Sequence, residues 1–297
     1  MGVLSTLSAD LAASVASVGQ SVVQVEGRRR GPASGVVWNE QGLVVTANHV
    51  LTSDENIGVG LGNGKAYEAG LVGRDPTTDL ALLRTDAKLK TASEWRGTDD
   101  LRVGHLVLAL GRPGKTVRAA LGIISALGDS WRTAAGGNVD HYLQADMSSY
   151  PGFSGGPLAT AEGAVVGINT SGLLRDTTVT VPTATVKRVV EELLKSGRIS
   201  RGYLGVGVQP ARLPAGLARQ LGQETGLLVI SVDSGSPGEK AGLVFGDTVL
   251  ALGQDLVRHW DDLIALLGQE RIGQTIDVRI LRAGQVQERK ITIGERP

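Results

Sequence analysis

Three side chains in the first half of the chain could together perform acyl transfer: His49, Asp79 and Ser154. Ser154 lies among glycines in "YPGFSGGPL", His49 ends an apolar run in "VVTANHVL", and Asp79 precedes one in "DPTTDLALL". A serine hydroxyl is a weak nucleophile, so a histidine must take its proton and an aspartate must fix the imidazole tautomer. Each residue alone has an ordinary structural interpretation, but the three in this order predict a catalytic triad.

The segment around Ser154 also fits a different serine motif, the G-x-S-x-G elbow. In that motif a helix follows the serine at once and the histidine comes later in the chain. Here Gly155, Gly156 and Pro157 follow the serine, which is a poor helix start, and only His259 lies downstream. We therefore prefer the arrangement in which loops of a double barrel carry the three residues.

The glycine before the nucleophile predicts where a developing oxyanion would be stabilised. Backbone N–H groups can converge on such an oxygen if no bulky side chain hinders the approach. We therefore assign the oxyanion hole to the backbone of Gly152, Phe153 and Ser154, chiefly to the N–H groups of Gly152 and Ser154.

Short strands must position these residues. The chain first forms an amphipathic helix, because Leu4, Leu7, Leu11, Val15 and Val18 recur at helical spacing, with Ser8 as its expected cap. From Ser21 onward, short runs rich in Val, Ile and Leu alternate with glycine-rich turns, which favours an antiparallel barrel or sandwich.

A second unit follows the helix predicted over "TATVKRVVEELLKSG", which Gly197 closes. Its strands are "YLGVGV", "GLLVISV", "DTVLALG", "TIDVRILR" and "QERKITI", with a short helix at "DDLIALLG". We expect one domain over residues 1–199 and another over 200–297.

Composition excludes several classes of function. Basic and acidic residues balance at 30 each, so no global field attracts nucleic acid. With 0 cysteines the chain has no disulfide and no thiolate nucleophile. His105 and His141 have no partners at metal-ligand spacing, so we expect neither a metal nor a cofactor.

The first twenty residues lack a basic start and a continuous apolar run. We expect neither a signal peptide nor a transmembrane segment in this chain, which leaves its compartment open: cytoplasmic, or exported with the targeting segment removed.

The motifs around His49, Asp79 and Ser154 resemble those of the HtrA/Deg family of serine proteases. "TANHV", "VGRDPTTDLALL" and "LQADMSSYPGFSGGPL" are similar to the family's histidine, aspartate and serine motifs, and "SPGEKAGLVFGDTVLALG" to its PDZ signature. The resemblance implies a mainly β chain, with a chymotrypsin-like double β-barrel followed by a PDZ domain. It also implies an ATP-independent endopeptidase that cleaves unfolded or extended polypeptide segments in protein quality control.

For the second unit the resemblance implies a peptide-binding groove that recruits substrate or regulates activity. "GYLGV" is similar to the carboxylate-binding loop, which would place the backbone of Tyr203, Leu204, Gly205 and Val206 around a peptide C-terminus. The extended peptide would then add to a sheet edge.

Some features depart from the family. Phe153 stands where the family usually has Asn, so we keep as an alternative a binding or chaperone-like protein with a collapsed oxyanion loop. The resemblance implies a homo-oligomer, a trimer. The family's trimers use aromatic residues near the N-terminus, whereas the first aromatic here is Trp38, which weakens this expectation.

The residues just before the nucleophile indicate which substrate side chain the specificity pocket prefers. They carry no charge and are Met147, Ser148, Ser149 and Tyr150. This favours substrates with a small or medium apolar side chain before the scissile bond.

Overall fold

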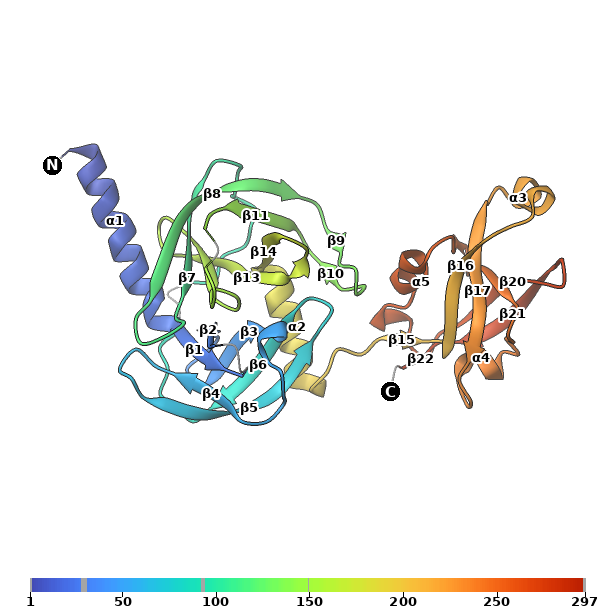
Figure 1. Ribbon diagram of the computed structural model, residues 1–297, viewed down its shortest axis with the longest axis horizontal. Helices are drawn as coiled ribbons and strands as arrows, with labels where there is room; N and C mark the ends of the chain where they lie inside the picture. Colours follow the sequence, from blue (N-terminus) through green and yellow to red (C-terminus); the bar gives the residue numbers. More distant parts are fainter. Residues whose placement is uncertain (1, 28–30, 92–93, 149, 296–297) are drawn as a thin grey trace. The chain divides into compact units, whose positions relative to one another are not determined.

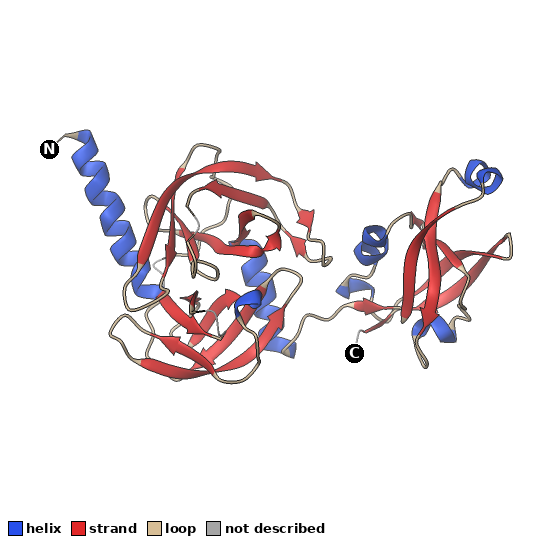
Figure 2. Ribbon diagram, in the orientation of Figure 1, coloured by secondary structure: helices blue, strands red, loops and turns tan. Residues whose placement is uncertain are grey.

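The computed structural model describes residues 2–27, 31–91, 94–148 and 150–295. The chain divides into two compact units, Met1–Ile199 and Ser200–Pro297. Strands make up most of the regular structure in each unit (Figure 2), which confirms the mainly β fold.

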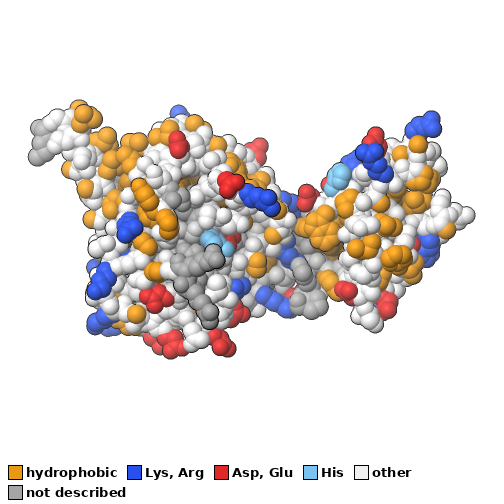
Figure 3. All heavy atoms as spheres, in the orientation of Figure 1, with side chains coloured by type: hydrophobic (Ala, Val, Ile, Leu, Met, Phe, Trp, Pro, Cys, Tyr) orange, Lys and Arg blue, Asp and Glu red, His pale blue; other side chains and the backbone are white. Residues whose placement is uncertain are grey.

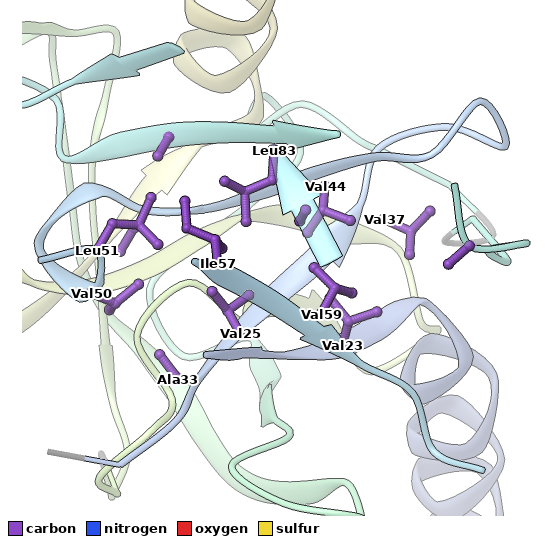
Figure 4. Close-up of a cluster of buried hydrophobic side chains, with 14 of the residues drawn as sticks. Val23, Val25, Ala33, Val37, Val44, Val50, Leu51, Ile57, Val59 and Leu83 are labelled. Carbon is purple, nitrogen blue, oxygen red and sulfur yellow. The ribbon is translucent and has the colours of Figure 1, made fainter. Parts of the chain in front are cut away.

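The first six strands form a closed antiparallel barrel in the order β1-β2-β3-β6-β5-β4 (Figure 1). They are β1 (Val22–Glu26), β2 (Ala33–Val37), β3 (Leu43–Ala47), β4 (Ile57–Gly60), β5 (Ala66–Asp75) and β6 (Leu80–Thr85). Successive side chains on a strand point to opposite faces. In β3, Val44 accordingly joins the cluster inside the barrel (Figure 4), whereas Leu43 and Val45 pack outside it.

A second six-stranded sheet follows, in the order β11-β8-β7-β12-β13-β14. Its strands are β7 (Leu106–Gly111), β8 (Arg118–Gly128), β11 (Tyr142–Asp146), β12 (Pro157–Thr160), β13 (Val165–Leu174) and β14 (Thr177–Pro182). Its edge strands β11 and β14 come into contact without pairing, so the sheet curls into a barrel that is open along one seam. A two-stranded ribbon, β9 (Trp131–Arg132) with β10 (Asn138–Val139), extends from it.

The two barrels share a buried apolar layer. Leu43, Val45 and Leu82 of the first barrel meet Ile168 and Val181 of the second. Helix α2 (Thr183–Ser196) covers this layer with Val186, Val189, Val190 and Leu193, and ends at Gly197 in the left-handed conformation. The end of β3 and the start of β6 thereby lie beside β13.

Helix α1 (Val3–Val18) begins earlier than expected. Gly2, in an extended conformation, occupies its N-cap, so the predicted cap at Ser8 was wrong: Ser8 lies inside the helix because no residue before it interrupts the helical turn. Only the C-terminal end of α1 is buried, and Leu11, Val15 and Val18 pack near β7 and β12. Apolar side chains remain visible along the outer part of α1 (Figure 3), with Val3 84% and Leu4 81% exposed.

A 3-10 turn, η1 (Gly19–Ser21), joins α1 to β1, and another, η2 (Asn48–Val50), follows β3. Within the described ranges, no helix combines the length and the apolar character needed to cross a bilayer.

The second unit is built on a sheet in the order β16-β17-β18-β20-β21, with β19 paired to β18. The strands are β16 (Val206–Arg212), β17 (Thr225–Val232), β18 (Thr248–Leu252), β19 (Asp255–Leu256), β20 (Thr275–Arg282) and β21 (Gln285–Thr292). A short ribbon pairs β15 (Gly202–Tyr203) with β22 (Gly294–Glu295). The sequence predicted the helix α5 (Trp260–Leu266), but missed α3 (Ala215–Leu221), α4 (Pro237–Lys240) and the turn η3 (Gln269–Arg271).

Candidate active site

His49 and Asp79 meet because β3 pairs with β6. In this pairing Ala47 lies opposite Leu80. The turn η2, which contains His49, therefore lies beside Asp79, the residue that precedes β6. The His49 Nδ1 atom lies 2.7 Å from Asp79 Oδ2, and the His49 N–H donates to Asp79 Oδ1 at 2.8 Å. Asp79 is 3% exposed, so its carboxylate is held in a fixed orientation that selects the tautomer with the proton on Nδ1. The Nε2 atom is then free to act as the base.

The second barrel also contributes to this carboxylate. The Thr170 hydroxyl on β13 donates to Asp79 Oδ2, and the Gly172 N–H donates to Thr170 Oγ1 at 2.9 Å. A Cβ atom on Gly172 would lie 2.6 Å from Asp79 Oδ2 and 2.7 Å from His49 Nδ1, so only glycine fits there. Neither residue was expected from the sequence, where the only signal is a small-residue run, "NTSG", within an apolar strand.

Ser154 reaches the same region from the loop before β12. The Ser34 N–H donates to the Ser154 carbonyl at 3.1 Å, and the Gly155 N–H donates to the Asn169 carbonyl at 2.9 Å. The Ser154 hydroxyl is hydrogen bonded to Ser171 Oγ at 3.2 Å; among the described residues no hydrogen bond joins it to His49. Both Ser154 and His49 line one cavity of about 410 Å³. Such catalytic hydrogen bonds are often long before substrate binds.

The backbone before the nucleophile forms a tight turn. The Phe153 N–H donates to the Tyr150 carbonyl at 3.1 Å, and Gly152 has a φ of 92°. Proline at the second position and a left-handed glycine at the third are what a type II turn requires. Because its N–H is used within the turn, Phe153 is not available as a donor to the predicted oxyanion hole. The N–H groups of Gly152 and Ser154 have no acceptor among the described residues.

The Phe153 side chain points away from the cavity. It is 1% exposed and packs inside the second barrel, with its ring edge-to-face against Tyr150 at 5.5 Å between centroids. It therefore fixes the loop by packing and does not approach the reacting atoms.

Two residues that the sequence analysis missed fix the Gly152 carbonyl. The Ser34 hydroxyl donates to it at 2.6 Å and accepts the Arg112 N–H at 2.7 Å. The Arg112 guanidinium, 8% exposed for the whole residue, donates to the carbonyls of Gly19, Val22 and Lys115. Burial lowers the pKa of Arg112. Gly19, which directly follows α1, and Gly152, in the turn before Ser154, are thus joined through adjacent hydrogen bonds.

In the second unit the predicted carboxylate loop lies between β15 and β16. The Leu204 carbonyl accepts from the Gly238 N–H at 2.7 Å, and the Gly205 carbonyl from the Asp233 N–H at 2.8 Å. Within the described part of the chain, the N–H groups of Leu204 and Gly205 have no acceptor. Tyr203 pairs with Gly294 and Val206 with Val232, so they hold the two ends of the loop. β16 is an edge strand.

Comparisons with known proteins agree with this architecture. Residues 33–168 match the trypsin-like peptidase domain and residues 202–293 the PDZ domain. A probable periplasmic serine endoprotease, DegP-like, from Rhizobium meliloti (strain 1021) is 39% identical over 279 residues, covering 91% of this chain and 54% of that protein. The chain thus spans about half the length of the curated relatives it matches.

Solved structures match over nearly the whole chain. The serine endoprotease from Yersinia pestis is 31% identical with a TM-score of 0.73, over 97% of this chain and 98% of that one. The HtrA-type protease AlgW with a tripeptide is 32% identical with a TM-score of 0.71, over 97% of each chain.

Proposed function

Since this chain belongs to the HtrA-type serine proteases, we propose that it is an ATP-independent serine endopeptidase that cleaves unfolded or extended segments of polypeptide. One observation carries the proposal: the buried Asp79 is hydrogen bonded to His49, and His49 shares one cavity with Ser154. These residues come from separate segments of both barrels, and no structural need of either barrel calls for this combination.

The proposed chemistry follows from the geometry. His49 Nε2 takes the proton of Ser154 as its oxygen attacks the substrate carbonyl, and Asp79 stabilises the imidazolium that results. The N–H groups of Gly152 and Ser154 stabilise the oxyanion. His49 then returns the proton to the leaving amine, and water hydrolyses the acyl-enzyme by the same route.

The alternative, a binding or chaperone-like protein with a collapsed oxyanion loop, is not favoured. The relatives are named endoproteases, and the N–H groups that would form the hole have no acceptor among the described residues. Phe153 supports an ordered loop because it is packed in the barrel core.

The assignment is tested by digesting casein and unfolded lysozyme with the wild type and with Ser154→Ala. Loss of the nucleophile is expected to reduce turnover on the order of 10⁶-fold. Ser125→Ala, which changes an exposed serine on β8, is the matched control and is expected to keep full activity. Equal digestion by wild type and Ser154→Ala would refute the proposal.

For the second unit, we propose that the loop Tyr203–Val206 binds the free C-terminus of a peptide. Two N–H groups that have no acceptor among the described residues, together with the adjacent edge strand β16, support this, because an extended peptide can pair with such an edge. The test uses the Ser154→Ala chain with C-terminal peptides, each as the free acid and as the amide. Equal affinity for acid and amide would contradict carboxylate binding. The homo-oligomer remains a prediction.

A further inference from the structure

The first three residues of the turn Tyr150–Phe153 form one wall of the cavity that Ser154 lines. Of the other residues expected to shape this pocket, Met147 and Ser148 do not line it, and Ser149 lies outside the described residues. The two N–H groups assigned to the oxyanion hole lie within this turn and directly after it. The position of the turn therefore decides whether these groups point at the reacting oxygen.

A short segment after β7, Gly111–Pro113, packs directly against this turn. A Cβ atom on Gly111 would lie 2.7 Å from Phe153 Cδ1, and a Cβ atom on Gly152 would lie 2.6 Å from the Pro113 Cβ. Neither glycine has room for a side chain, so the segment and the turn are in close contact at two places. Because a packed interior transmits displacements, a shift of Gly111–Pro113 would move the turn.

The Arg112 side chain fastens this segment to the first barrel. Its guanidinium donates to the Val22 carbonyl at 2.6 Å and to the Gly19 carbonyl at 2.9 Å. Val22 begins β1, and Gly19 begins η1. A third hydrogen bond, to the Lys115 carbonyl at 2.8 Å, closes the loop that follows β7. Three fixed acceptors therefore hold the planar guanidinium in one orientation.

This guanidinium is buried without a counter-ion. Among the described residues, no ion pair includes Arg112. Gly62 closes over it, since a Cβ atom there would lie 2.6 Å from Arg112 Nη1. Burying a cation against carbonyl groups alone costs free energy that a neutral side chain would avoid. Stability of the barrels therefore does not account for this arginine, whereas its rigid set of donors suits the positioning of a loop.

We propose that Arg112 is a positioning residue for the proposed endopeptidase reaction, on which this inference rests: its guanidinium holds Gly111–Pro113 against the turn Tyr150–Phe153. Arg112 does not line the cavity, so it acts on the reacting atoms only through this segment. Its loss disturbs the transition state, in which the oxyanion forms, more than the binding of substrate. The expected signature is a lower kcat with KM retained.

The test measures kcat and KM for the wild type, Arg112→Ala and Arg112→Lys on a peptide that contains a bond which the wild type cleaves in casein. A thermal melt of each chain accompanies the kinetics. Lysine keeps the charge but cannot reproduce the planar set of donors. Arg96→Ala, which removes a partly exposed arginine paired with Glu94, is the matched control.

Added guanidinium separates positioning from stability. Arg112→Ala and Arg96→Ala are also assayed with about 50 mM guanidinium chloride, far below the molar range that unfolds proteins, and with the same concentration of sodium chloride. A guanidinium ion can enter the space that Arg112→Ala leaves and donate to the same three carbonyls.

We expect kcat to fall about 30-fold in Arg112→Ala and about fivefold in Arg112→Lys, with KM within about twofold of the wild-type value and Arg96→Ala unchanged. Guanidinium, but not sodium chloride, is expected to raise kcat of Arg112→Ala at least about threefold and to leave Arg96→Ala unaffected. A merely structural role would lower the melting temperature and leave kcat unchanged below the melt.

An unchanged kcat in either Arg112 variant, or a folded Arg112→Ala that guanidinium does not restore, overturns this inference and leaves the endopeptidase function standing. If Arg112→Ala does not fold, the kcat of Arg112→Lys decides. No cleavage by the wild type together with no labelling of Ser154 by a fluorophosphonate would overturn both proposals.

Discussion

The Ser34 hydroxyl on the first barrel donates a buried hydrogen bond to the carbonyl of Gly152 on the second, with 2.6 Å between the oxygens. This contact fixes the peptide that follows Gly152, and the same hydroxyl accepts the Arg112 N–H. The loop cannot rotate without leaving a buried carbonyl unpaired, which costs about 1–3 kcal/mol. The loop of the proposed oxyanion hole is therefore held by a side chain of the first barrel.

Removing this contact should reduce catalysis more than binding. We expect Ser34→Ala to lower kcat on the order of tenfold with little change in KM, because the turn that carries the Gly152 and Ser154 N–H groups is no longer held at the Gly152 carbonyl between them. Kinetics on a peptide substrate and a thermal melt measure the two effects. Ser14→Ala, which removes the 2.6 Å hydrogen bond from Ser14 to the Ala161 carbonyl, is the control and should lower stability only. A matching fall in kcat for Ser14→Ala would show that lost stability, not loop position, is responsible.

Gly172 is expected to be intolerant of any side chain. The Cβ of Gly172→Ala would push against both Asp79 and His49, so we expect kcat to fall by about 100-fold or more. Gly70→Ala is the control, because a Cβ there meets nothing within 4 Å. The measurements are peptide turnover and fluorophosphonate labelling of Ser154. Normal labelling of Gly172→Ala would mean that the imidazole can shift without loss of function.

The structure brings His49 to Asp79 and places Ser154 at the same cavity, as the predicted triad requires, and there is a physical reason why the sequence could indicate these three residues. The histidine, aspartate and serine lie in local patterns, each at a strand end or a glycine turn, and their order along the chain restricts the possible sites. Thr170, Gly172 and Ser34 could not be predicted, because their roles depend on which strand lies beside them. The hydrogen bond from the Phe153 N–H was missed because it depends on the turn type, which Pro151 and Gly152 could have indicated.

Phe153 should matter for stability through its packing. Phe153→Asn removes a ring that is 1% exposed and places an amide in the apolar interior of the second barrel. We expect it to lower the free energy of unfolding by about 3–5 kcal/mol and to reduce activity, with the preferred cleavage sites unchanged. Denaturant titration and cleavage mapping measure these. Phe245→Asn, at a side chain that is 75% exposed, is the control. If Phe153→Asn were as stable as the wild type, the space that the Phe153 ring fills in the second barrel would accept a polar side chain.

Gly205 should be required for peptide capture in the second unit. Its φ is 69°, and a Cβ there would lie 2.2 Å from the Ser236 Cβ. Gly205→Ala must therefore move the loop that presents the free N–H groups, and we expect it to weaken binding of a free C-terminus at least about tenfold. Gly222→Ala is the matched control, because Gly222 has a similar φ of 62° but nothing lies within 4 Å of the added atom. Titration of a fluorescent peptide into each variant on the Ser154→Ala background gives the affinities. Equal weakening in both variants would assign the effect to backbone strain, and unchanged binding in Gly205→Ala would place the carboxylate elsewhere.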